Sequence, residues 1–290
     1  MAHILGIGNA TLDIIYQVGA YPHENAEIRC SNQKYRRGGN TANLLVVLAG
    51  LGHACSFAGV LADDSAGRQV SADLLDNGID IASCRTCDSG STPVSSVLLS
   101  AATGSRTIVH YRDLPELSTT DFAALDLQPF DWLHFEGRNI AALQVMLQRS
   151  REHHPAIPRS LEVEKARDGI EDLFSLADVL LFSGDYARQR GYEQPERLLQ
   201  AIHADHPAAL ACCTRGADGA VAIDHRGRVF RHPGVAPGKV IDTLGAGDTF
   251  NAAIINGSLA GLDTSAILEQ ACTLAGRKCT RDGVTGLVQS

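Results

Sequence analysis

The chain has 290 residues, of which 44% are apolar and 5% aromatic, and its 33 acidic and 25 basic residues give a formal charge of −8. The two signs of charge are mixed and no basic stripe stands out, which argues against a nucleic-acid-binding protein. No apolar run reaches the roughly 20 residues that span a bilayer, and no basic leader precedes the first apolar residues, so we expect neither a membrane anchor nor a secretory signal.

The cysteine spacing does not fit a small disulfide-stapled domain, and we therefore expect reduced thiols and a cytoplasmic protein. Cys84 and Cys87 form a single C-x-x-C pair with no second pair nearby. This leaves zinc or redox use open, although chance spacing is the favoured explanation. The cysteines are Cys30, Cys55, Cys84, Cys87, Cys212, Cys213, Cys272 and Cys279.

Strand-like and helix-like patterns alternate along the chain, which predicts an α/β fold with a mostly parallel sheet covered by helices on both faces. In such sheets, ligands bind beyond the carboxyl ends of the strands. The expected strands are residues 3–9, 55–63, 132–137, 160–164, 179–184 and 208–214, and the expected helices are residues 41–52, 67–79, 140–154, 170–177 and 186–191.

Two segments break this rhythm with strand-like runs and no helix between them, residues 12–39 and 91–112. We interpret them as a small extra sheet that forms a lid over the α/β body. Residues 221–232 give another hairpin signal. No long linker or repeat is present, so we expect one domain over residues 1–290 with the lid as an appendage.

The stretch "DTLGAGDTF", residues 242–250, places glycines and a carboxylate at the start of an expected helix. Glycines permit close approach of the backbone, and a helix N-terminus attracts anions, so Gly245, Ala246 and Gly247 suit phosphate oxygens. Asp248 would then face a second substrate as a general base. From the residues alone, an equally good interpretation is a tight turn with Asp248 stabilising the first helical turn.

Other nucleotide-binding motifs fail. "GVAPGKV", residues 234–240, has Val240 where a phosphate loop needs Ser or Thr, and "GIGNAT", residues 6–11, lacks the third glycine of a dinucleotide fingerprint. A dinucleotide-dependent oxidoreductase is therefore not favoured.

The chain resembles the ribokinase-like, or PfkB, carbohydrate kinases. "DTLGAGDTFNA" (242–252) resembles their C-terminal signature and "RRGGNTAN" (36–43) their N-terminal one. The resemblance implies a three-layer α/β/α ribokinase-like fold with a β-sheet lid, and within the family the ketohexokinase subgroup is the most similar. Further matching pieces are "LDII" (12–15), "YPHENAEIRC" (21–30), "SRTIVHY" (105–111), "LHFEGRN" (133–139), "EVEKAR" (162–167) and "AGRKC" (275–279).

The resemblance implies a sugar site made of Asp13, Gly39, Asn40 and Asn43, with Asp248 as the catalytic base. Carboxylates and amides suit vicinal hydroxyls because they accept hydrogen bonds and, for amides, also donate them. Without the resemblance, Asp13 is better explained as a turn residue. Asn40 alone could be the cap of the helix that starts near Thr41.

For the nucleotide, the resemblance implies an anion hole of Gly245, Ala246 and Gly247. Each of the other implied residues also has a structural explanation without a ligand. Arg106 could be a solvated charge, and Thr214 and Gly216 could form an ordinary turn. The three residues on the last helix could simply pack in the core. These implied nucleotide-binding residues are Arg106, Thr214, Gly216, Ala275, Gly276 and Cys279.

The implied activity is transfer of a phosphoryl group from ATP to a primary hydroxyl of a ketose, with fructose 1-phosphate as the expected product. Mg²⁺ is expected to offset the triphosphate charge, with Glu164 as its candidate ligand, and a monovalent cation such as K⁺ is expected near the Asp242–Thr243 turn. Asn25 stands where the subgroup has an acidic lid residue, so the sugar substrate could instead be another ketose or a furanose.

The alternatives are a kinase for another sugar, such as ribose or the 6-hydroxyl of fructose, a nucleoside kinase, and a non-catalytic sugar-binding regulatory protein. A nucleoside kinase is expected to have an acceptor pocket lined by aromatic residues. A non-catalytic protein is expected to lack the base at Asp248 or the glycines of residues 245–247. Bare edges of a lid sheet invite pairing, and the resemblance implies that lids clasp each other, so we expect a homodimer.

Overall fold

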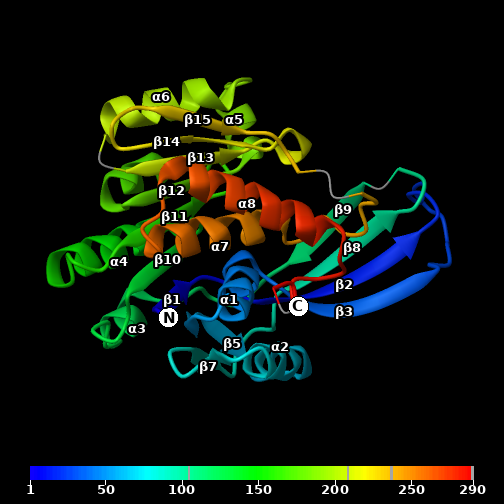
Figure 1. Cartoon of the computed structure of the whole chain (residues 1–290). Helices are drawn as coiled ribbons and strands as arrows, with labels where there is room; N and C mark the ends of the chain where they lie inside the picture. The colour runs from blue at the N-terminus through cyan, green and yellow to red at the C-terminus, as the bar shows by residue number, and fades with distance from the viewer. Residues whose placement is uncertain (104, 208, 236–237, 289–290) are drawn as a thin grey trace.

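The computed structural model describes residues 1–103, 105–207, 209–235 and 238–288. Among these residues, the largest sheet has nine strands (Figure 1). Its spatial order is β15 (Val229–His232), β14 (Ala220–Ile223), β13 (Leu210–Thr214), β12 (Val179–Phe182), β11 (Arg159–Val163), β10 (Trp132–Glu136), β1 (His3–Ile7), β4 (Ala54–Ala58) and β6 (Ile79–Asp80). All neighbouring pairs from β13 to β6 are parallel, while β14 and β15 continue the sheet antiparallel.

Helices cover both faces of this sheet, because successive strand residues point to opposite sides. Ile4 packs into one hydrophobic cluster and Leu5 into the other. The first cluster is completed by α1 (Asn40–Gly50), α2 (Ser65–Asp76), α7 (Ala246–Leu259) and α8 (Thr264–Cys279), and the second by α3 (Thr119–Ala123), α4 (Ile140–His153), η1 (Ile170–Leu176), α5 (Gly184–Gln189) and α6 (Pro195–Asp205).

The three-layer α/β/α fold and its mostly parallel sheet are thus confirmed. In the helix expected over residues 170–177, Ile170–Leu176 form a 3₁₀ helix rather than an α-helix and Ala177 is extended. Residues 55–63 are also not one strand: β4 belongs to the central sheet, whereas β5 (Val60–Ala62) pairs with β7 (Arg85–Cys87) in a separate parallel pair. Ala208, the expected first residue of β13, lies outside the described residues.

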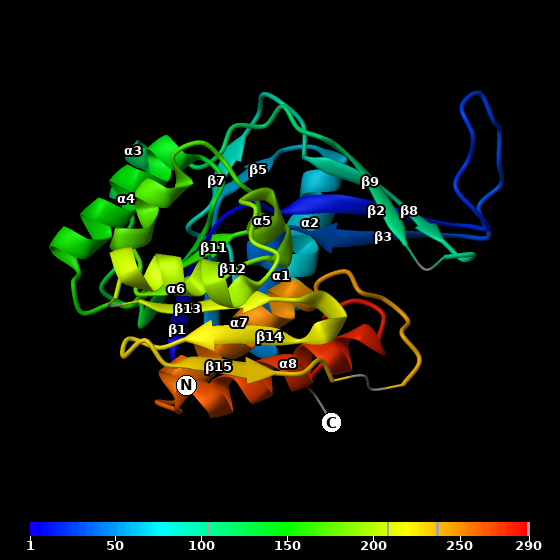
Figure 2. The same cartoon turned by 90° about the horizontal axis from the view of Figure 1, so that it is seen from above.

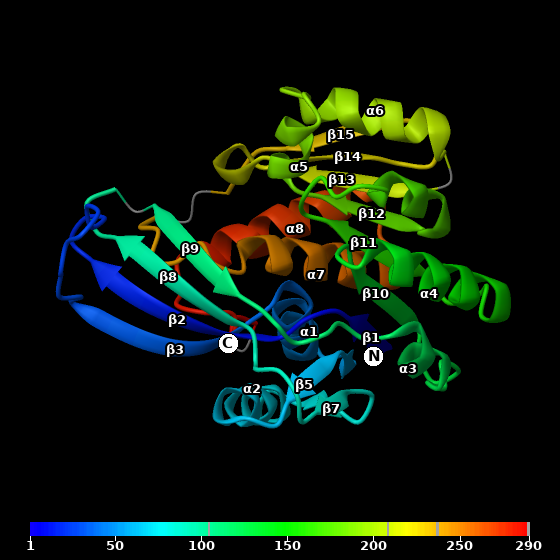
Figure 3. The same cartoon turned by 180° about the vertical axis from the view of Figure 1, so that it is seen from behind.

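A small second sheet is built from the two segments that broke the alternation. It projects from one end of the α/β body (Figures 1 and 3), and residues 19–31 extend beyond it as a long loop (Figure 2). Its role as a lid, and the division of the chain into one domain plus lid, remain predictions. Its strand order is β3 (Asn32–Gly38), β2 (Thr11–Val18), β8 (Val94–Ser100) and β9 (Arg106–Tyr111).

All eight cysteines are free. The Cys84 thiol donates to the Phe57 carbonyl and the Cys87 thiol to the Ser89 carbonyl, so neither points to a shared metal. None of the described helices has the length and apolar character needed to cross a membrane.

Candidate active site

Two large cavities open at the carboxyl ends of the central strands. The first, of about 430 Å³, lies between the small sheet, the start of α1, the ends of β10 and β11, and the start of α7. The second, of about 500 Å³, lies between α8, the start of α7 and the turn η2 (Gly216–Asp218). The cavities meet, since both are lined by Arg106, Ser183, Asp185, Thr214, Thr243 and Gly247.

The start of α7 lies where the two cavities meet. The residue before the helix is Gly245, with φ of 82°, and a Cβ there would lie 2.8 Å from Val284 Cγ1. A glycine is therefore needed to turn the chain into the helix. Gly247 lines both cavities, and the free N–H groups and positive end of the helix dipole suit an anion at this junction.

Asp248 is in the first turn of α7 and lines the first cavity, although it is only 8% exposed. Its Oδ2 accepts a hydrogen bond of 2.7 Å from Asn43 Nδ2. Burial raises the pKa of Asp248 to about 7, while the Asn43 hydrogen bond opposes the rise and the nearby Glu164 and Glu136 add to it. A carboxylate with this proton affinity suits general-base catalysis near neutral pH.

Three further carboxylates stand near Asp248 at the ends of β10 and β11: Glu136, Glu162 and Glu164. Burial, followed by the charge of Asp248, raises the pKa of Glu162 well above its usual range, which favours the protonated acid. Glu162 Oε1 accepts from Asn251 Nδ2 at 3.1 Å and from Asn40 Nδ2 at 3.2 Å.

The structure brings the residues expected at the sugar site together around the first cavity. Asp13, on β2, accepts a hydrogen bond of 3.0 Å from Thr11 Oγ1. The alternative that Asn40 caps α1 is wrong: α1 begins at Asn40 itself, Gly39 is in the cap position, and the Asn40 amide donates to Glu162 and Glu164 instead. The cavity-lining members of this set are Asp13, Gly39, Asn40, Asn43 and Asp248.

The residues expected at the nucleotide site lie around the second cavity or its junction with the first. Arg106, on β9, donates from Nη1 to Thr243 Oγ1 at 2.7 Å. Those lining the second cavity are Arg106, Thr214, Gly216, Ala246, Gly247, Ala275, Gly276 and Cys279, and Gly245 lines the first.

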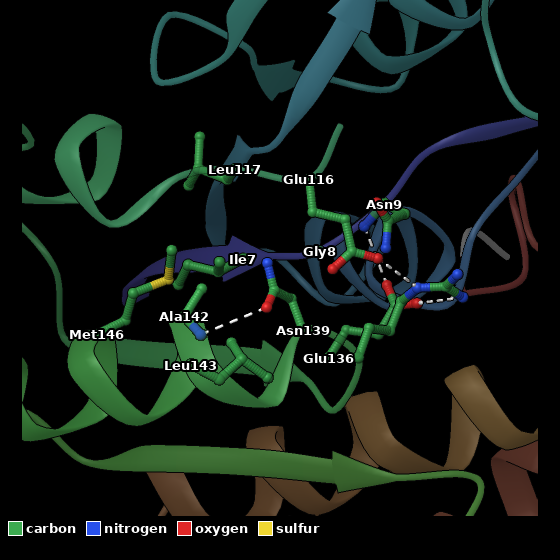
Figure 4. Close-up of a pocket in the computed structure, with 11 residues that line it drawn as sticks. Ile7, Gly8, Asn9, Glu116, Leu117, Glu136, Asn139, Ala142, Leu143 and Met146 are labelled. Carbon is green, nitrogen blue, oxygen red and sulfur yellow. Dashed lines mark hydrogen bonds and ion pairs between the residues drawn. The ribbon is translucent and has the colours of Figure 1, made fainter. Parts of the chain in front are cut away.

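Sequence reasoning missed a ring of polar contacts at the base of the small sheet, where Asn9, Glu116 and Glu136 converge (Figure 4). Glu136 Oε2 accepts from the Asn9 N–H at 3.0 Å, and Arg112 Nη1 donates to Asn9 Oδ1 at 2.6 Å. Arg138 closes the ring by pairing with Glu116 at 3.0 Å and Glu136 at 3.7 Å. A neighbouring cavity of about 20 Å³ has room for one water molecule.

One signal could have found the buried carboxylates of this region. Glu136 and Glu162 interrupt the apolar runs of expected buried strands, and charged residues are almost never fully buried without a specific reason.

The residues present do not assemble a protein-only metal site. No group of three or more His, Cys, Asp or Glu side chains among the described residues is placed to hold a metal ion. Glu164 Oε2 accepts from Asn40 at 3.4 Å. At the Asp242 carbonyl, where a monovalent cation was expected, the buried Lys278 ammonium donates at 2.8 Å. Mg²⁺ with Glu164 as a ligand and K⁺ near the Asp242–Thr243 turn stay predictions.

Comparisons with known proteins agree with this geometry. The sequence profile described as "pfkB family carbohydrate kinase" matches residues 1–289. Ketohexokinase of Mus musculus is 36% identical over 293 residues, covering 98% of each chain, and aminoimidazole riboside kinase of Salmonella typhimurium is 28% identical over 84% of this chain and 77% of that protein. The structure of Arabidopsis thaliana ribokinase complexed with ribose and ATP has a TM-score of 0.78 at 22% identity, covering 100% of this chain and 99% of that one, which shows the shared fold.

Proposed function

The chain belongs to the pfkB family of carbohydrate kinases, and from this premise we propose that it transfers the γ-phosphoryl group of ATP to a primary hydroxyl of a ketose, with fructose giving fructose 1-phosphate as the first candidate. The observation that carries the proposal is the position of Asp248. It lines the polar cavity one residue after Gly247, which lines both cavities, so one helix start presents amides and a carboxylate to two ligands.

The second cavity supports the assignment of ATP. Ala275 and Gly276 have small side chains that leave space for a flat base, and Thr214 is placed between both cavities. The triphosphate would extend toward the α7 N-terminus, where Gly245, Ala246 and Gly247 form the proposed anion hole. Mg²⁺ bound with the nucleotide would offset the phosphate charge.

The first cavity supports a sugar with several hydroxyls. Asp13 on β2 and the pair Asn40 and Asn43 on α1 offer acceptors and donors around one space. The 36% identity to a ketohexokinase over the whole chain supports a ketose. Asn25, the position that departs from the subgroup, lies exposed in the β2–β3 loop with φ of 62°.

In the proposed reaction, Asp248 accepts the proton of the attacking hydroxyl while the amides of Gly245, Ala246 and Gly247 and the Arg106 guanidinium stabilise the transferred charge. Movement of the small sheet toward the body would exclude water that otherwise hydrolyses ATP. Eight free thiols suit a reducing compartment, so we place the reaction in the cytoplasm.

The function is tested by measuring ADP release with a panel of ketoses, aldoses, sugar phosphates and nucleosides, followed by NMR of the product to locate the phosphate. Fructose with phosphate on carbon 1 is the expected result. A preference for a riboside would instead place the protein nearer the aminoimidazole riboside kinase relative. Sugar binding without ADP release from any compound would favour the non-catalytic alternative and contradict the proposal.

The role of Asp248 is tested by Asp248→Asn, which should retain ATP binding and lose at least about 10²-fold of turnover, the scale of general-base effects. Asp63→Asn is the matched control, because Asp63 is exposed and forms an ion pair with the exposed Arg68. Near-normal turnover in Asp248→Asn would show that Asp248 is not the base.

A further inference from the structure

Arg37 is a buried cation that touches neither cavity. It is the second-to-last residue of β3, and its side chain is only 2% exposed. Its Nε donates to Asp73 Oδ1, on α2, at 2.6 Å, and its Nη1 donates to Asn43 Oδ1, on α1, at 2.6 Å. The guanidinium therefore lies between a carboxylate on one side and an amide on the other.

The Asn43 amide passes this contact on to the candidate base. Its Oδ1 is bonded by Arg37, and its Nδ2 donates to Asp248 Oδ2 at 2.7 Å. Asp73, Arg37, Asn43 and Asp248 thus form one chain of short hydrogen bonds from α2 through β3 and α1 to α7. Short bonds to charged partners are among the stronger hydrogen bonds in proteins.

This arrangement allows only one orientation of the amide. If the Asn43 amide were flipped, its NH₂ group would face the guanidinium and its oxygen would face the Asp248 carboxylate, so both contacts would become repulsive. The N–H of Asn43 is consequently held toward Oδ2 of Asp248. Among the described residues, Oδ1 of Asp248 receives no hydrogen bond, which leaves it for a hydroxyl of the acceptor.

We propose that Arg37 is a positioning residue for phosphoryl transfer: through Asn43 it fixes which oxygen of Asp248 faces the acceptor and tunes how readily that carboxylate takes a proton, while Asp73 moderates the guanidinium charge. The inference rests on the proposed role of Asp248 as the base. Charged groups near Asp248 are Glu162 on β11, Glu164 directly after β11, Glu136 on β10 and Arg37 on β3. The three carboxylates favour the protonated acid, and Arg37 opposes them.

The test exploits the opposite charges of Arg37 and Asp73. Arg37→Met removes the cation, so the acidic limb of the pH profile of kcat/KM for the sugar should move to higher pH by about 0.5–1 unit. Asp73→Asn leaves the cation less neutralised, so the same limb should move to lower pH. Loosening of the structure alone gives no reason for the two variants to move the limb in opposite directions.

Arg37→Lys is the conservative variant. It keeps the charge but not the planar guanidinium that bonds both Asp73 and Asn43. The acidic limb should therefore return most of the way to its position in the unmodified protein, while kcat stays several-fold lower than in the unmodified protein. The KM for ATP should be unchanged in all variants, because Arg37 lines neither cavity.

Arg159 provides a matched control for the loss of a buried arginine. It pairs with Asp178 at 2.8 Å at the start of β11, with side-chain exposures of 5% and 49%, close to the 2% and 35% of Arg37 and Asp73. Arg159→Met should lower the melting temperature by a similar amount and leave the acidic limb in place. Should Arg37→Met fail to fold, Asp73→Asn and Arg37→Lys still test the direction of the shift.

The outcomes separate this inference from the proposed function. If Asp248→Asn abolishes turnover while folded Arg37 and Asp73 variants leave the limb unmoved, or move it in the same direction as each other, Arg37 is only structural and the inference is overturned. If Asp248→Asn keeps its turnover, Asp248 is not the base and the premise of this inference fails, whereas only the absence of ADP release with every sugar overturns the proposed function.

Discussion

At the scale of single residues, the candidate base carries a thermodynamic cost. Asp248 is held in a buried place among other acids, where its charged form is poorly solvated, and the Asn43 hydrogen bond offsets only part of this cost. Such placement is common at functional sites, where a shifted proton affinity is part of the chemistry. Two measurements on Asp248 follow from it.

The first concerns activity. Because the pKa of Asp248 is about 7 and the base must be deprotonated, kcat/KM for the sugar should fall about tenfold for each pH unit below 7 and level off above it. Initial rates between pH 5.5 and 8.5 with saturating ATP would show this. A profile that stays flat down to pH 5.5 would contradict it.

The second concerns stability. The pKa of Asp248 is higher in the folded chain than its ordinary value of 3.8, so the folded state binds the proton more tightly and stability is lost as pH rises from about 4 to 7. Asp248→Asn should therefore stabilise the fold at pH 8, by about 1 kcal/mol or more, and much less at pH 4.5. Urea unfolding at both pH values is the measurement, and an equal effect at the two would refute it.

The residues of the site differed in how visible they were in the sequence. Asp248, Asn40 and Asn43 stand in dense motifs, so their approximate place was predictable. Glu162 is bonded by Asn251, which is 89 positions away in the sequence, and Arg37 bonds Asp73, which is 36 positions away. Arg37 is part of the RRGGNTAN motif (36–43), but only the fold reveals that its guanidinium is buried against α1 and α2.

At the scale of elements, the turn before α7 is held in shape by α8 and β3. Lys278, on α8, is fully buried and bonds both the carbonyl and the carboxylate of Asp242 at 2.8 Å. Burial alone would raise the pKa of Asp242, but Lys278, the Gly283 N–H and Arg36 bring it down to about 2. Asp242 thus stays charged, and the turn that leads into Gly245 has a fixed anchor.

Lys278→Met should be strongly destabilising, because it leaves the Asp242 carboxylate buried without its nearest cation. Breaking one side of such a pair typically costs 3–5 kcal/mol, so about this loss in the free energy of unfolding is expected. Lys34→Met, which breaks the exposed lysine–aspartate pair with Asp282, serves as the comparison. Chemical unfolding of both variants tests the difference, and equal stabilities would argue against the anchor.

The element-scale differences from the sequence have local causes. Gly39 has φ of 100°, and a Cβ there would come within 2.2 Å of the Asn9 carbonyl, so the cap position of α1 is taken by a glycine and Asn40 is drawn into the helix. The run at 55–63 divides because Gly59 separates two strands that pair with different partners. The periodicity of apolar residues indicates where strands lie, but it does not indicate which strands pair with each other.

At the scale of the whole molecule, the alternation of strands and helices was enough to predict the layered body, since each βα unit is local. The order of the strands was not predictable in this way, because β1 lies between β4 and β10, which are contributed by distant segments. The same holds for the small sheet, whose β2 and β8 pair in parallel although paired residues such as Leu12 and Val94 are 82 positions apart. Asp13 on β2 and Arg106 on β9 belong to this one sheet, and both line the first cavity.

The small sheet also leads to the last prediction, which concerns assembly. Its outer strands β3 and β9 have unpaired edges within the described chain, and Tyr35, Val109 and Tyr111 on them are 54–65% exposed. Exposed edges and apolar side chains together favour pairing with another chain. We therefore expect a homodimer formed through this sheet, seen by light scattering at micromolar protein. Val109→Lys should shift the mass toward the monomer, whereas Val145→Lys, an exposed valine on α4, should not. A monomeric mass for the unmodified protein, or an equal effect of the two lysines, would show that this sheet does not mediate assembly.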